Sequence, residues 1–231
     1  RCPPRGLIRL GAARRRIVPG AFDRPNMTRI AVIDFETTGT SPGMGDRATE
    51  VAIVMTEGGR VVDRFQSLMN AGVHIPAFIT QLTGITNAMV QAAPPAAQVM
   101  AEAARFVGDT PMVAHNASFD RRYWQAELAL CGLPAPQPYA CTVLLSRRLY
   151  PEAPSHKLGS LVDWFGLPRT GQAHRALADA EMAAELLGRI RHDLMLRHGV
   201  ARPDHAFLRA LQTCSKAALP KFWARQATAV A

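Results

Sequence analysis

The sequence predicts an α/β domain in which α-helices flank a mixed β-sheet. Two features of the pattern lead to this fold class: two strand-like runs joined by a tight turn come first, and helical and strand-like stretches alternate after them. A tight turn joins antiparallel neighbours, whereas strands separated by helices pair in parallel. The 231 residues suit one substantial domain with tails, and they contain no internal repeat.

Five stretches have the composition or the pattern of strands. Residues 30–33 form a short apolar run of the kind that is buried in the centre of a sheet. The runs 50–55 and 61–69 are separated by a turn at 57–60, whose two glycines predict a hairpin. Two shorter strands are expected over 111–115 and 139–141.

Helices account for most of the remaining pattern. A Pro-Pro start and many alanines predict a helix over 95–107, and Gly132 ends an amphipathic helix over 117–131. Apolar residues near a 3.6-residue period predict a long helix over 175–196. Shorter helices are expected over 76–83, 142–149, 157–165 and 204–213.

The positive charge of the chain lies at its two ends. Of the net +9, residues 1–26 carry +6 and residues 199–231 carry +4, which leaves −1 for residues 27–198. Basic tails can attract polyanions because neutralised phosphates release counterions, but the body has no such charge. We predict a disordered basic leader or upstream sequence over 1–26, a folded domain over 27–198 and a basic, partly helical extension over 199–231. A transit peptide is an alternative for the leader, although serine is absent from it.

The composition excludes several classes of protein. No stretch approaches the roughly 18 apolar residues that a membrane span needs, so no membrane partner is expected. Seventeen proline and seventeen glycine residues are too few for a low-complexity chain. The four cysteines are far apart and lack a CxxC spacing, so neither a disulfide scaffold nor a thiolate zinc site is expected. These features predict a protein of the reducing cytoplasm.

Acidic residues stand where three predicted elements begin or end. Asp34 and Glu36 are two residues apart at the end of the first strand, so their side chains share one face of the sheet. Asp120 lies in the first turns of a helix, and Asp179 lies near the start of the long helix, with His174 in the loop before it. Taken singly, these carboxylates have ordinary explanations, because helix N-termini favour acids and a strand end is solvated.

Taken together, these residues indicate hydrolytic phosphoryl transfer. Four carboxylates from one strand end and two helix starts can converge on one point, where oxygen ligands suit Mg²⁺ or Mn²⁺. Two such ions about 3.5–4 Å apart clamp the attacking and leaving oxygens of a phosphodiester. A nearby histidine can accept a proton from the attacking water.

Three short segments carry these residues: DFETTG at 34–39, HNASFD at 115–120 and HRALAD at 174–179. In this order they resemble the three motifs of the DEDDh, or DnaQ-like, 3′–5′ exonuclease family, which includes the proofreading epsilon subunit of bacterial DNA polymerase III. LTGIT at 82–86 and the segment 141–167 are also similar to that family. The resemblance therefore covers most of the chain, and the domain over 27–198 would be an exonuclease domain.

The resemblance implies a ribonuclease H-like fold with a five-stranded mixed β-sheet flanked by α-helices. It implies that Asp34, Glu36, Asp120 and Asp179 hold two divalent cations, Mg²⁺ or Mn²⁺, with Asp34 bridging them. His174 would be the general base, and its place five residues before Asp179 selects the histidine branch of the superfamily. All five positions have the expected residue type, which disfavours a descendant that only binds.

The resemblance also implies contacts to the substrate. The residues concerned are Phe35, Thr37, Thr38, Leu82, Asn116 and Phe119, and Leu82 would wedge against the last base. The alternative for Leu82 and Phe119 is an ordinary place in the core. Lys157, Arg169 and Arg175 are candidates for phosphate contacts, although solvated side chains would have the same sequence. Phosphate contacts position a strand without reading its sequence, so we expect weak sequence preference.

The expected activity is a metal-dependent 3′–5′ exonuclease that releases nucleoside 5′-monophosphates from single-stranded or frayed DNA 3′ ends, in proofreading or repair. One alternative keeps the chemistry and changes the substrate to RNA or short oligonucleotides, although the spelling DFETTG favours DNA. Another is a non-catalytic module that docks on a DNA polymerase catalytic subunit. No clamp-binding or polymerase-tethering motif is recognisable over 199–231, so a proofreading subunit and a free-standing enzyme both stay open.

Overall fold

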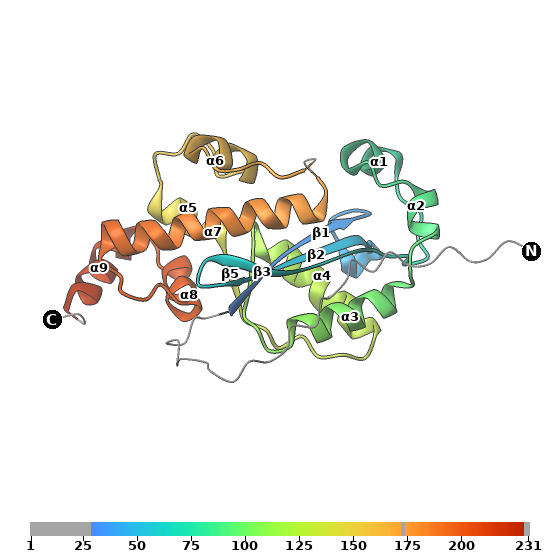
Figure 1. Cartoon of the computed structure of the whole chain (residues 1–231), viewed down its shortest axis with the longest axis horizontal. Helices are drawn as coiled ribbons and strands as arrows, with labels where there is room; N and C mark the ends of the chain where they lie inside the picture. Colours follow the sequence, from blue (N-terminus) through green and yellow to red (C-terminus); the bar gives the residue numbers. More distant parts are fainter. Residues whose placement is uncertain (1–28, 172–173, 229–231) are drawn as a thin grey trace, which may run out of the picture.

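The computed structural model describes residues 29–171 and 174–228. A five-stranded sheet in the order β3-β2-β1-β4-β5 forms its centre (Figure 1). The strands are β1 (Arg29–Thr37), β2 (Ala48–Glu57), β3 (Arg60–Leu68), β4 (Met112–Ala114) and β5 (Tyr139–Cys141). The first three pair antiparallel, whereas β4 pairs parallel with β1 and β5 parallel with β4. This confirms the predicted five-stranded mixed sheet and its hairpin.

Helices cover both faces of the sheet (Figure 1). Those on one face are α3 (Ala96–Val107) and α4 (Ala117–Leu130), which share a buried apolar cluster with the strands. Those that share the cluster on the other face are α5 (Thr142–Leu149), α6 (Leu158–Phe165), α7 (Ala176–His198) and α8 (His205–Thr213). The short helices α1 (Ala77–Thr83) and α2 (Asn87–Gln91) follow the hairpin. Among the described residues, no helix is both long enough and apolar enough to cross a bilayer.

The alternation of side chains along β1 decides which residues reach each cluster. Ala31, Ile33 and Phe35 belong to the cluster under α3 and α4, whereas Ile30 and Val32 belong to the cluster under α7. Because the side-chain period of a strand is two, the next two even-numbered residues point to the α7 side. The strand thereby brings its two acids to the layer that α7 occupies.

The C-terminal stretch packs on the second cluster. Leu208 and Leu211 of α8 are buried in it, which confirms the predicted helix over 204–213. Within α8, the ring Nε2 of His205 lies 2.8 Å from the Met112 carbonyl oxygen, so the helix is also bonded to β4. Phe222 and Trp223 of α9 (Leu219–Thr228) pack against the same cluster. The division at residue 198 stays a prediction, and the leader over 1–26 lies outside the described residues.

Two buried glutamates join the helices to the start of β2. Glu127 of α4 accepts hydrogen bonds from Nε and Nη2 of Arg47, at 2.9 and 2.8 Å, and from the Ala48 N–H at 2.9 Å. Glu50 of β2 accepts from Nε and Nη2 of Arg175, at 3.1 and 2.9 Å, and from the Ala176 N–H at 3.1 Å. We refer to these as the Glu127 anchor and the Glu50 anchor. They fix the start of β2 to α4, and β2 to the N-terminus of α7.

Candidate active site

The four predicted carboxylates converge at one end of the sheet. Asp34 and Glu36 lie in the last part of β1, Asp120 in the first turn of α4 and Asp179 in the first turn of α7. Asp120 is 2% exposed and Glu36 is 9% exposed. The negative charges of Asp120, Glu36 and Asp179 all act on Asp34. Residues up to 145 positions apart in the chain thus form one acidic cluster.

Burial raises the pKa values of all four groups, and repulsion from neighbouring carboxylates adds to the rise at Asp34 and Glu36. Burial, together with the charges of Asp179 and Glu50, raises the pKa of Glu36 to about 8. Burial raises the pKa of Asp120 to about 8, against a hydrogen bond from the Phe35 backbone. The pKa of Asp34 is raised well above its ordinary value, and that of Asp179 is also raised, in both cases chiefly by burial. The surrounding protein therefore stabilises the ionised form of the cluster poorly.

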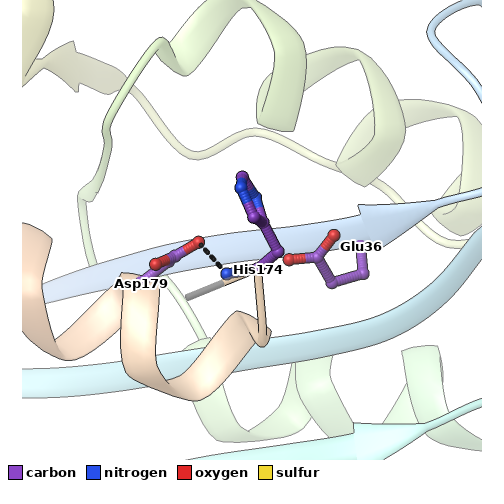
Figure 2. Close-up of side chains that lie close together, drawn as sticks. All are labelled: Glu36, His174 and Asp179. Carbon is purple, nitrogen blue, oxygen red and sulfur yellow. Dashed lines mark hydrogen bonds between the residues drawn. The ribbon is translucent and has the colours of Figure 1, made fainter. Parts of the chain in front are cut away.

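His174 stands beside this cluster. Its backbone N–H donates to Oδ2 of Asp179 at 3.3 Å, and its side chain rises between Asp179 and Glu36 (Figure 2). Ligand atoms of Glu36, His174 and Asp179 all lie within 4.8 Å of one another. The side chain is exposed, and its φ of 59° is in the left-handed region. A mildly strained, accessible histidine among acids is an arrangement typical of functional sites.

Two hollows meet at this point, and His174 and Asp179 line both of them. The first, of about 590 Å³, is the apolar hollow; it is also lined by Asp34, Glu36, Phe78, Leu82 and Phe119. The second, of about 1010 Å³, is the basic hollow; it is also lined by Asn116, Arg147, His156, Lys157, Asp163 and Arg169. The acidic cluster therefore has open space on two sides that differ in chemical character.

Leu82 and Phe119 both line the apolar hollow, but their side chains are held differently. Leu82 is 50% exposed, so the alternative that places it in the core is wrong. Phe119 is half-buried and packs on Tyr123, with 4.9 Å between ring centroids, so it serves the core and the hollow together. Phe35 also lines the hollow, but its side chain is only 4% exposed and belongs to the core.

Thr37, Thr38 and Asn116, the other predicted substrate contacts, do not present their side chains to the apolar hollow in the way that Leu82 does. The hydroxyl of Thr37 donates to the Gly39 carbonyl at 2.6 Å, and Oγ1 of Thr38 accepts from the Arg47 N–H at 3.0 Å. Both hydroxyls thus hold the turn after β1, although both residues line the apolar hollow. Asn116 is exposed and lines the basic hollow instead.

Two of the three candidate phosphate contacts have carboxylate partners. Arg175 belongs to the Glu50 anchor, and Arg169 bonds both oxygens of Asp163 at 2.9 and 2.7 Å. Lys157 is exposed, and its ammonium group has no ion-pair partner among the described residues. The sequence suggests the same role for all three cations, whereas the structure shows that two of them are paired with carboxylates and that, within the described part of the chain, Lys157 is not.

Sequence reasoning missed Glu50 and Phe78. Glu50 is fully buried and faces Glu36 across the strand pair. Burial would raise its pKa, but hydrogen bonds from Arg175, Gln66 and the Ala176 N–H hold it below its ordinary value. Phe78 is 64% exposed and lies one helical turn before Leu82 on α1. The available signals were an acid at the start of an apolar strand and the i, i+4 spacing of two apolar residues.

The donor set of the cluster fits divalent cations. It consists of carboxylate oxygens, which Mg²⁺ and Mn²⁺ prefer, in a buried or half-buried place. The guanidinium of Arg175 lowers the pKa of Glu36, but that group is already bound to Glu50. Cations would relieve a repulsion that the described positive groups offset only in part.

We expect the metal-free protein to lose stability as pH rises from about 7 to 8. Over that interval the folded state retains protons on Glu36 and Asp120, whose pKa values are about 8, whereas the unfolded state has released them. The lowered pKa values of histidines such as His115, at about 4, act in the opposite direction, but that effect is complete near pH 7. Thermal melting in EDTA at the two pH values should show that Tm falls by about 2–4 °C for each kcal/mol by which the free energy of unfolding decreases.

Adding Mn²⁺ should raise Tm most at the higher pH, because the ions bind the ionised carboxylates. A Tm in EDTA that stays constant or rises between these two pH values would contradict the repulsion inferred for the acidic cluster.

The sequence and the fold are similar to those of known proteins. Residues 31–187 match the RNase_T family, described as Exonuclease. The chain is similar to the 3′–5′ exonuclease DinG of Bacillus subtilis, with 39% identity over 171 residues, which are 72% of this chain and 18% of that protein. It is also similar to DNA polymerase III subunit epsilon of Aquifex aeolicus, with 33% identity over 182 residues, covering 78% of this chain and 88% of that protein.

A solved structure, exonuclease X in complex with 5′ overhanging duplex DNA, superposes with a TM-score of 0.61 and 30% identity. The match covers 78% of this chain and 98% of that chain. Several of the curated relatives are much longer, and the chain spans less than a third of their length.

Proposed function

Because the chain belongs to the DEDDh, or DnaQ-like, exonuclease family, we propose that it is a metal-dependent 3′–5′ exonuclease acting on DNA. It hydrolyses the terminal phosphodiester of a strand and releases nucleoside 5′-monophosphates. The observation that carries the proposal is the acidic cluster of β1, α4 and α7 with His174 beside it. The intact cluster also argues against a module that only docks.

The residues proposed to hold two divalent cations, Mg²⁺ or Mn²⁺, are Asp34, Glu36, Asp120 and Asp179. When bound, the ions polarise the phosphodiester and stabilise the charge that develops on the attacking and leaving oxygens. The two anchors hold α4 and α7 against β2, so the carboxylates face one another before any substrate arrives. Preorganised charges of this kind need little rearrangement during the reaction.

His174 is the proposed general base. Its exposed imidazole can accept a proton from the attacking water and return it to solvent. The hydrogen bond from its backbone N–H to Asp179 keeps the residue beside the cluster. The chain thereby supplies the proton acceptor next to the proposed metal ligands.

The apolar hollow is proposed to hold the terminal nucleoside. Leu82 and Phe119 would contact its base, while Phe35, Thr37 and Thr38 would contact its sugar and phosphate, the threonines through their backbone groups. Asn116 would contact the strand from the basic hollow. These contacts are largely independent of base identity, so weak sequence preference follows.

The proposed substrates are single-stranded or frayed DNA 3′ ends. The similar exonuclease X structure is a complex with duplex DNA, and the similar Aquifex protein is a subunit of DNA polymerase III. A DNA polymerase catalytic subunit is therefore a proposed partner, with proofreading or repair in the cytoplasm as the setting. RNA and short oligonucleotides are the alternative substrates that the test below separates.

The test is a 3′-end digestion assay with 5′-labelled single-stranded DNA, duplex DNA, mismatched duplex DNA and RNA. With Mg²⁺ or Mn²⁺ we expect single-stranded and mismatched DNA to shorten one nucleotide at a time, with release of 5′-monophosphates. EDTA should abolish the release, and excess metal should restore it. Faster digestion of RNA would change the substrate class, and no release with either metal would falsify the enzyme proposal.

A further inference from the structure

The basic hollow is the larger of the two spaces beside the acidic cluster. The proposed reaction at the cluster does not involve the part of this hollow that lies away from His174 and Asp179. Much of its wall comes from α5, the loop before α6, and α6 itself, none of which carries a proposed metal ligand. Arg147 of α5 and Lys157 directly before α6 lie on this wall. The hollow adjoins the apolar hollow at His174 and Asp179.

The unpaired charge on this wall is positive. Arg169 and Asp163 neutralise each other as a bidentate pair. Arg147 and Lys157 are exposed, and neither side chain has a hydrogen-bond or ion-pair partner among the described residues. Two unpaired cations therefore line the same hollow as Asp179 of the acidic cluster.

Two of the histidines that line the hollow, His115 and His156, add little charge of their own. His115 bonds Thr142 and the His156 carbonyl, at 2.9 and 3.0 Å, and its pKa is about 4 because of burial. The pKa of His156 is lowered by burial and by the positive charges of Arg147 and Lys216, against Glu152. The field at His156 thus agrees with a positive potential in this hollow.

We propose that the basic hollow binds the phosphodiester backbone of the substrate strand on the 5′ side of the scissile bond, with Arg147 and Lys157 as its phosphate contacts. The proposal rests on the proposed function. A terminal nucleoside in the apolar hollow places the scissile phosphate at the acidic cluster, and the strand must then leave through space continuous with that cluster. Space that is lined by unpaired cations and shares His174 and Asp179 meets this requirement.

This assignment gives the strand a direction across the molecule. The base at the 3′ end is held by apolar side chains, and the backbone that follows is held by charge. Contacts to phosphates are insensitive to sequence and sensitive to salt. Substrates with one phosphodiester should therefore gain nothing from this hollow, whereas longer strands should.

The test compares two substrates of the wild-type protein and the double variant Arg147→Ala/Lys157→Ala. One is the p-nitrophenyl ester of thymidine 5′-monophosphate, which has a single phosphodiester, and the other is a short oligothymidylate. The double variant should lower the ratio of kcat/KM for the oligonucleotide to that for the ester by about tenfold. The slope of log kcat/KM against log salt for the oligonucleotide should become shallower by about 0.7 per lost contact.

Matched controls are Arg105→Ala on α3 and Lys221→Ala on α9, which remove exposed cations that line neither hollow. Both should leave the ratio and the slope unchanged, and Lys157→Arg should preserve most of the ratio. If the double variant hydrolyses the ester but keeps the wild-type ratio and slope, the strand path is overturned and the proposed function stands. If the wild-type protein hydrolyses neither substrate, the proposed function fails, and the strand path fails with it.

Discussion

Asp34→Asn is expected to lower kcat/KM for 3′-end digestion by at least about 10³-fold, because loss of a central ligand removes several kcal/mol of metal-assisted stabilisation. The same change should stabilise the metal-free protein. Burial and the charges of four other carboxylates raise the pKa of Asp34, so a neutral amide of similar size relieves both the desolvation cost and the repulsion. At pH 8 in EDTA we expect Tm to rise by about 2–4 °C.

These opposite effects separate a functional role from a folding defect. A digestion assay gives the activity, and melting curves with and without Mn²⁺ give the stability and its dependence on the metal. Asp109→Asn is the matched control, because Asp109 is exposed and lies outside both hollows. Retained activity, or a metal-free Tm that falls with Asp34→Asn, would contradict the proposed ligand role.

His174→Ala is expected to lower kcat by about 10²–10⁴-fold, which is the usual contribution of a general base. Affinity for Mn²⁺ should change little, since the four carboxylates remain. Single-turnover digestion measures the rate of the chemical step, and isothermal titration with Mn²⁺ measures the affinity. His192→Ala, at an exposed position on α7, is the matched control.

The result also decides between two roles for His174. Its ligand atom lies within 4.8 Å of those of Glu36 and Asp179, so the geometry is compatible with a third ligand as well as with a base. A loss of metal affinity in proportion to the loss of rate would make His174 a ligand.

The core of the site could be predicted because short-range rules determine it. The two-residue period of β1 places Asp34 and Glu36 on the α7 side, next to the apolar residues that precede them. Because β4 is parallel to β1, α4, which follows β4, begins at the end of the sheet where Asp34 and Glu36 lie, and the Glu50 anchor holds the start of α7 there. The hairpin followed from two glycines between strand-like runs, and its register needed no long-range information.

The partners of charged side chains could not be predicted in this way. Glu50 and Arg175 are 125 positions apart, and the local sequence around neither residue indicates that they form an ion pair. In the sequence, Arg169 and Lys157 are both candidate cations for a phosphate contact. Only the contact of Arg169 with Asp163 distinguishes them. The short helix α2, held by the Thr86 hydroxyl on the Met89 N–H, was missed because five residues give too little periodicity.

The side chains that hold α4 and α7 to the sheet, in the Glu50 and Glu127 anchors, are different from the four proposed metal ligands. The four proposed metal ligands have no part in the hydrogen bonds that clamp α4 and α7 to the sheet, although Glu50 of one clamp also repels Glu36. Evolution can therefore exchange an acid of the cluster, and with it the chemistry, without loosening the framework around it. An altered anchor would instead let the helices drift apart while every reacting group is still present.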